Sequence, residues 1–186
     1  MRMPRALTLV LALALAGPAA AAEWQVLSER SSIRFEYILD GEPAEGSFRR
    51  FSGEGQLDAE RPGEAALELR IEAGSIDLGN ALVSAYATSL EWFDAKEHPQ
   101  VVYRLTELER EAGDRFAATG RIVLKGRTER LVTPFRLETG ARTARARGRL
   151  TVDRRAFGLG TELTDLFVEI GAEVVVRFDL HARRID

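Results

Sequence analysis

Two histidines and a few close pairs of carboxylates are the side chains in this sequence best suited to acid–base or metal chemistry. Neither His98 nor His181 has neighbours at the spacing of a metal site or of a nucleophile and its base. His98 stands before Pro99, which is typical of a loop or a helix cap. His181 falls in the polar phase of the last predicted strand, so we expect it to face water.

The carboxylate pairs, Asp58 with Glu60 and Asp94 with Glu97, could serve as general acid and base. In a chain with 29 acidic residues, solvated surface carboxylates are the commoner explanation. The absence of cysteine excludes thiol catalysis, disulfides, thiolate metal sites and covalent haem attachment. We therefore expect no enzyme activity, no catalytic residue, no metal and no cofactor. The weaker hypothesis of a lipid hydrolase or isomerase would depend on one of the two histidines.

The 26 basic residues are interspersed with the acidic ones, which argues against a nucleic-acid partner. The one notable run of arginines alternates with small and apolar residues, as on the solvated face of a strand. This run comprises Arg142, Arg145, Arg147 and Arg149.

The N-terminus has the pattern of a secretory signal peptide. Arg2 and Arg5 precede an apolar run over residues 6–16, and small residues follow up to Ala22. The run is far shorter than the ~20 residues that a helix needs to span a bilayer. The sequence thus predicts a cleavable signal peptide over residues 1–22 and a single exported, periplasmic domain over residues 23–186.

From Trp24 onward the dominant pattern alternates apolar and polar residues, which predicts β-strands with one wet face. We count about eight strands, joined by turns that contain glycine and Asp or Lys, such as Asp40-Gly41 and Lys125-Gly126. Helical spacing of apolar residues is confined to about residues 79–98, where we expect one or two short helices.

An antiparallel sheet of about eight strands can close into a barrel that is wide enough for one ligand. A two-sheet sandwich is the alternative fold. Small residues fall at several inward positions and could leave space inside, or they could meet large neighbours in a filled core; these are Gly53, Gly55, Ala118, Gly120, Ala144, Ala146, Gly148 and Ala172.

Several stretches, taken in order, resemble the YceI-like family of periplasmic lipid-binding proteins over nearly the whole mature chain. The matching stretches are Ser32-Ile33-Arg34-Phe35, Gly46-Ser47-Phe48, Phe51-Ser52-Gly53, Ser75-Ile76, Ser89, Glu91-Trp92-Phe93-Asp94, Pro99, Gly120, Leu124-Lys125-Gly126, Thr128, Arg154, Phe157-Gly158-Leu159 and residues 171–176. The chain departs from the family's polar residues at Ser31, Val83, Ser84, Tyr86, Ala87 and Ala156.

The resemblance implies an eight-stranded antiparallel β-barrel of lipocalin-like shape, mainly β, with a short helical segment. It also implies an apolar tunnel for an isoprenoid, an isoprenoid quinone or a fatty-acid derivative. The departures fall where the family has polar head-group contacts, so the sequence leaves the ligand's identity open.

We predict a periplasmic carrier that holds a long-chain amphipathic lipid. The predicted tunnel wall comprises Phe35, Tyr37, Phe48, Leu69, Ile71, Tyr86, Phe93, Phe116, Ile122, Val174, Val176 and Phe178. A homodimer and transient contact with the inner membrane or a membrane redox protein are further hypotheses. The alternative function is an envelope interaction or scaffold protein with a filled barrel.

Overall fold

A computed structural model describes residues 22–58, 60–160 and 169–185. The predicted signal peptide therefore lies outside the described residues except for Ala22, which begins the first strand. The strands are β1 (Ala22–Val26), β2 (Ser32–Leu39), β3 (Glu42–Phe48), β4 (Phe51–Leu57), β5 (Ala66–Glu72), β6 (Ile76–Asp77), β7 (Gln100–Ala112), β8 (Arg115–Leu124), β9 (Arg127–Thr139), β10 (Thr143–Asp153) and β11 (Glu173–Arg184). The described part of the chain has one α-helix, α1 (Ala81–Ala87), and short 3₁₀ turns.

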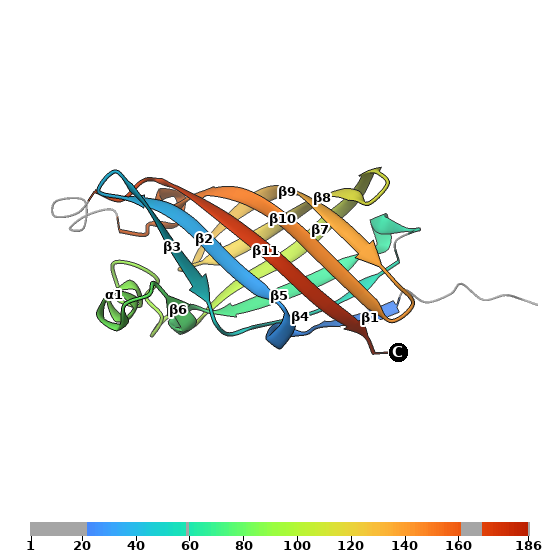
Figure 1. The fold of residues 1–186 in the computed structure, drawn as a ribbon, viewed down its shortest axis with the longest axis horizontal. Coiled ribbons are helices and arrows are strands. Elements are labelled where there is room, and N and C mark those ends of the chain that lie inside the picture. The colour runs from blue at the N-terminus through green and yellow to red at the C-terminus, as the bar shows by residue number, and fades with distance from the viewer. Residues whose placement is uncertain (1–21, 59, 161–168, 186) are drawn as a thin grey trace, which may run out of the picture.

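The strands close into an antiparallel barrel (Figure 1). The ring runs β1-β4-β5-β7-β8-β9-β10-β11, and β11 pairs back to β1 with Val26 opposite Ala182. Strands β2, β3 and β6 continue β1, β4 and β5 beyond local bends, so β11 also pairs with β2. The predicted eight-stranded barrel is confirmed, and the sandwich alternative is wrong.

The bends and turns come from residues that satisfy the backbone locally. At the bend between β3 and β4, the Ser75 hydroxyl accepts from the Arg50 amide at 3.1 Å and donates to the Glu72 carbonyl at 2.7 Å. Asp40 and Gly41 both have positive φ, of 51° and 82°, which is the backbone of a tight hairpin turn. Lys125 and Gly126 repeat that geometry.

Helix α1 is shorter than the segment that the apolar spacing predicts. The Asn80 side chain caps its start by accepting from the amides of Leu82 and Val83, at 2.9 and 3.2 Å. At its end the Thr88 hydroxyl donates to the Ala85 carbonyl, and residues 88–98 continue as turns. Side-chain hydroxyls that bond to nearby backbone compete with helix propagation, which accounts for the early stop. In residues 22–58, 60–160 and 169–185, no helix is long and apolar enough to cross a membrane.

A buried arginine fastens the end of the barrel that carries α1. Arg154 is only 2% exposed. Its guanidinium donates hydrogen bonds to the carbonyls of Gly171, Leu159 and Ile170. It also lies 5.6 Å from the centre of the Trp92 ring. Carbonyl partners compensate for the lost hydration of the cation, so Arg154 ties the loop after β10 to the segment after α1.

Inward glycines make room for aromatic rings that lie against the barrel wall. A Cβ on Gly46 would come within 2.4 Å of the Phe35 ring, and one on Gly120 within 2.3 Å of the Tyr103 ring. Gly148 has the same relation to the Phe178 ring. Neighbouring rings thus fill the space beside these glycines. Open space inside the barrel depends on other positions.

Candidate functional site

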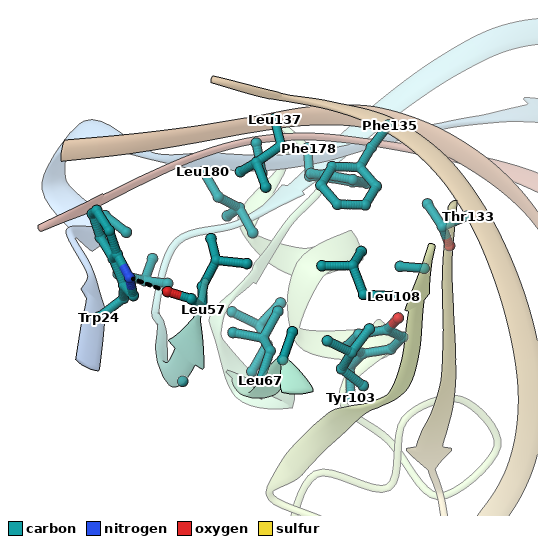
Figure 2. A pocket seen from close by; sticks show the side chains of 18 of the residues that line it. Trp24, Leu57, Leu67, Tyr103, Leu108, Thr133, Phe135, Leu137, Phe178 and Leu180 are labelled. Atoms are coloured by element: carbon teal, nitrogen blue, oxygen red, sulfur yellow. Dashed lines mark hydrogen bonds between the residues drawn. The ribbon is translucent and has the colours of Figure 1, made fainter. Parts of the chain in front are cut away.

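A cavity of about 230 Å³ lies inside the half of the barrel that is remote from α1. It extends from Trp24 and Leu57, near the start of β1 and the end of β4, to Ile33 and Val176 near the middle of the barrel. Figure 2 shows Leu67, Leu108, Leu137 and Leu180 facing one another across it. Because Ala118, Ala144 and Ala146 also line it, small side chains on β8 and β10 help to keep the space open.

The residues that line this cavity include no aspartate, glutamate, lysine, arginine or histidine. A charged group placed there would lose its hydration without gaining an opposite charge. Long hydrocarbon chains gain most from such a wall, at roughly 25 cal/mol per Å² of apolar surface removed from water. The geometry therefore suits an uncharged, apolar portion of a ligand.

The polar side chains on this mostly apolar wall are those of Gln56, Tyr103 and Thr133, and the last two carry hydroxyl groups. Tyr103 on β7 and Thr133 on β9 both line the cavity (Figure 2). Burial raises the pKa of Tyr103 to about 12, because desolvation disfavours the phenolate. The phenol therefore stays protonated at neutral pH and can donate a hydrogen bond.

Five of the twelve predicted tunnel residues line this cavity. They come from β5, β8 and β11 and are Leu69, Ile71, Ile122, Val176 and Phe178. The structure brings these five together around one space, and their contact with a ligand stays a prediction.

Five other predicted residues lie in a separate aromatic cluster at the α1 end of the barrel, which we define as Phe35, Tyr37, Phe48, Phe93 and Val174 with Ile76 and Ala87. The Phe35 and Phe48 ring centres are 5.6 Å apart, and those of Phe48 and Phe93 are 5.7 Å apart. Such ring pairs contribute packing energy beyond their buried area. The aromatic cluster adjoins the inner end of the cavity through Val176, which packs against it.

The last two predicted residues lie elsewhere. Tyr86 is 50% exposed on α1, and its hydroxyl donates to Glu91 at 2.8 Å. Phe116 is 2% exposed and packs with Leu108, with its ring 6.0 Å from that of Phe135 and the Arg110 guanidinium 5.1 Å from its centre. Neither side chain lines the cavity.

Several residues that line the cavity are not among the twelve predicted tunnel residues. Most follow the alternation of strands that were predicted, and they include Trp24, Val26, Leu67, Tyr103, Leu105, Leu131, Thr133, Phe135, Leu137, Leu150, Val152 and Leu180. Leu108 is different, because β7 has a register shift between Leu105 and Glu107. That bulge reverses the phase of the alternation, so strict period-two counting places Leu108 on the wrong face.

The acid–base candidates do not converge on the cavity. The His181 Nε2 lies 3.4 Å from Asp179 on β11, and His98 lies in the loop before β7, where its ring faces Gly126. Asp58 is bound by Arg61 and by the Glu60 amide in a local loop; the backbone hydrogen bond from Glu60 is the main reason that its pKa is lowered. Among the described residues, no three His, Asp or Glu side chains gather as metal ligands would.

Charges are paired across strands on the outer face of the barrel. Arg145 on β10 binds Asp179 on β11 at 2.6 Å, and Arg177 binds Glu36 on β2 at 2.6 Å. Hydrogen bonds from these arginines lower the pKa of each carboxyl. The arginine run predicted on a wet strand face thus takes part in surface ion pairs, while Ala144 and Ala146 on the same strand line the cavity.

Comparison with known sequences finds one family model, described as a YceI-like domain, that matches residues 24–182. A UPF0312 protein of Pectobacterium atrosepticum is 31% identical over 126 residues, which cover 66% of this chain. The alignment spans 65% of that relative's own length, so the chain matches slightly less than two thirds of it.

Two solved structures share the fold. BcnA of Burkholderia cenocepacia is 25% identical with a TM-score of 0.77, over 84% of this chain and 98% of that one. A polyisoprenoid-binding domain from Saccharophagus degradans, implicated in plant cell wall breakdown, is 14% identical with a TM-score of 0.73, over 90% of this chain and all of that domain. The second likeness concerns the fold alone.

Proposed function

The chain belongs to the family of YceI-like domains, and from that premise we propose that it is a periplasmic carrier that holds one long-chain amphipathic lipid in its barrel. The ligand class is an isoprenoid, an isoprenoid quinone or a fatty-acid derivative. The observation that carries the proposal is the cavity itself, which lies inside a closed barrel and has an uncharged wall. The similar fold of a polyisoprenoid-binding domain supports the choice of ligand class.

The energetics favour a chain over a compact ligand. Each buried methylene contributes roughly 0.8 kcal/mol, so about ten methylenes would supply ~8 kcal/mol before the cost of ordering the chain. The cavity's 230 Å³ is slightly below the ~300–1,000 Å³ of common small-molecule pockets. A longer chain has to extend beyond this space.

The proposal includes export by the predicted signal peptide and binding in place of catalysis. A carrier of this kind takes up and delivers its ligand by transient contact with the inner membrane or with a membrane redox protein. The alternative function, an interaction or scaffold protein, requires a filled barrel. The cavity argues against a filled barrel.

Extraction of the protein purified from its native host tests this function. The extract is analysed by mass spectrometry and compared with that of a variant in which Ala118→Leu and Ala146→Leu fill the cavity. We expect about one long-chain lipid per wild-type molecule and a strongly reduced amount in the filled variant. Repeated extraction of no lipid, or of equal amounts from both proteins, contradicts the proposal.

A further inference from the structure

The two hydroxyl groups on the cavity wall have no hydrogen-bond partner among residues 22–58, 60–160 and 169–185. Thr133 is 5% exposed and Tyr103 is partly buried, and neither side chain takes part in a hydrogen bond within the described chain. Neither oxygen is among the fully enclosed side-chain atoms that lack a partner, so both remain accessible from the cavity that their residues line. A hydroxyl that is accessible there is stabilised when a ligand atom bonds to it. Apart from Gln56, which is exposed, these two hydroxyls are the polar side-chain groups through which the lining residues could bond to a ligand without losing a partner in the chain.

The fold brings the two hydroxyls toward the same part of the wall. The Tyr103 ring crosses β8 above Gly120, where an added Cβ would lie 2.3 Å from the phenolic oxygen. Gly120 and Ala118 of β8 pair with Leu131 and Thr133 of β9, so the ring extends from β7 toward the strand that carries Thr133. In Figure 2 Tyr103 and Thr133 lie on the same side of the cavity. Gly120 is therefore the position that permits this arrangement.

The residues around the two hydroxyls limit which kind of ligand atom could bind to them. The wall has no cation to neutralise an ionised phosphate or carboxylate, and an unpaired anion there would be strongly destabilised. A neutral oxygen loses much less on burial, and it accepts a hydrogen bond from a phenol or an alcohol. With a pKa of about 12, the Tyr103 phenol is protonated throughout the neutral range and acts as donor.

We propose that Tyr103 and Thr133 form a subsite for a neutral oxygen, such as a ketone, quinone, ester or amide carbonyl, within the buried part of the ligand. The subsite makes the cavity selective for oxygen-bearing long chains over plain hydrocarbons, and it leaves any ionised group outside. This inference rests on the proposed function, since it assigns a ligand feature to the same cavity.

The test compares two probes that differ in one oxygen. They are a linear long-chain ketone with a mid-chain carbonyl and the alkane of equal length, with dissociation constants measured by competition against a fluorescent long-chain lipid. One neutral hydrogen bond corresponds to about a fivefold change in affinity. We expect the wild-type protein to bind the ketone about 5- to 20-fold more tightly than the alkane.

Variants that remove the hydroxyls but keep the shape of the side chains show whether these two residues cause the preference for the ketone. In the Tyr103→Phe, Thr133→Val double variant we expect the ketone preference to fall to about one, with alkane affinity retained as evidence of an intact cavity. Tyr37→Phe is the matched control, because Tyr37 lies in the aromatic cluster and does not line the cavity. It should keep the wild-type preference.

The outcomes separate this inference from the proposed function. If both probes bind but the preference survives in the double variant, or is lost in Tyr37→Phe, the subsite is wrong while the carrier function stands. If the hydroxyls bind only water, the wild type shows no preference, which also overturns the subsite. If neither probe nor the fluorescent lipid binds the wild type, the proposed function itself fails.

Discussion

The two halves of the barrel use the same alternating strands to opposite effect. In the half near α1, the rings of Phe35, Phe48 and Phe93 pack together, and Gly46 accommodates one of them. In the other half, the small side chains of Ala118 and Ala144 line the cavity. Apolar alternation is the same in both halves. The sizes of the inward side chains that face one another across the strands therefore decide which half is filled.

The largest difference should appear when an aromatic ring is removed from each half. Phe35→Ala removes a 9% exposed ring from the aromatic cluster and should lower the free energy of unfolding by about 3–5 kcal/mol. Phe178→Ala removes a ring that already borders the cavity, so we expect a loss below about 3 kcal/mol. Urea unfolding of both variants measures the two values; equal losses would remove the distinction between the halves.

Adding a single methyl group to each half should give the next largest effect. Gly46→Ala would bring its Cβ within 2.4 Å of the Phe35 ring and 2.7 Å of Leu78, in a filled region. Gly120→Ala meets the Tyr103 ring, which can move into the cavity. Within the ~1–3 kcal/mol typical of overpacking, we expect Gly46→Ala near the upper limit and Gly120→Ala near the lower one. Thermal unfolding that ranks them in the reverse order would contradict this.

The cap of α1 tests whether the two halves act independently. Asn80→Ala removes the side chain that accepts from two helix amides and should cost about 1 kcal/mol of stability. Asn80→Ser keeps a capping oxygen and serves as control. Because α1 lies at the end remote from the cavity, lipid affinity should not change in either variant. A marked loss of affinity in Asn80→Ala would show that the α1 end takes part in binding.

The smallest expected effect is the loss of stability at acid pH when the ion pairs on the outer face are broken. The Arg145 hydrogen bond holds the pKa of Asp179 below its usual 3.8, so the pair stabilises the fold above that pH. That contribution is lost as the pH falls through the lowered pKa. For a partly exposed pair it amounts to at most about 1 kcal/mol. Unfolding of wild type and Asp179→Asn at pH 7 and pH 2 should show a difference only at pH 7, and a difference that persists at pH 2 would count against the pair.

Much of the fold could be predicted because strand alternation and turn residues are local signals. Arg145, Arg147 and Arg149, predicted on the solvated face of a strand, lie on β10, and the predicted Asp40-Gly41 turn is present, with positive φ at both residues. The closed eight-stranded barrel followed from the number of strands and from the family resemblance. The extent of α1 did not follow, because hydroxyl groups that compete for the backbone act within one or two residues.

The site was harder to predict because it depends on which inward residues face one another. Phe48 and Ile71 have equivalent patterns, but only Ile71 faces the cavity, since Phe48 meets two other rings. Tyr103 and Leu105 follow the alternation of a predicted strand, so that signal could have found them. Leu108 needed knowledge of the β7 bulge, which has no clear signature in the sequence.

The central claim is that the half-barrel remote from α1 holds a hydrocarbon chain. Native mass spectrometry of the protein with a long-chain lipid, beside the Ala118→Leu, Ala146→Leu variant, tests this most directly. The account predicts one bound chain per wild-type molecule and at least tenfold weaker binding by the variant at preserved stability. Equal binding by both proteins, or no binding by the wild type at any chain length, would contradict it.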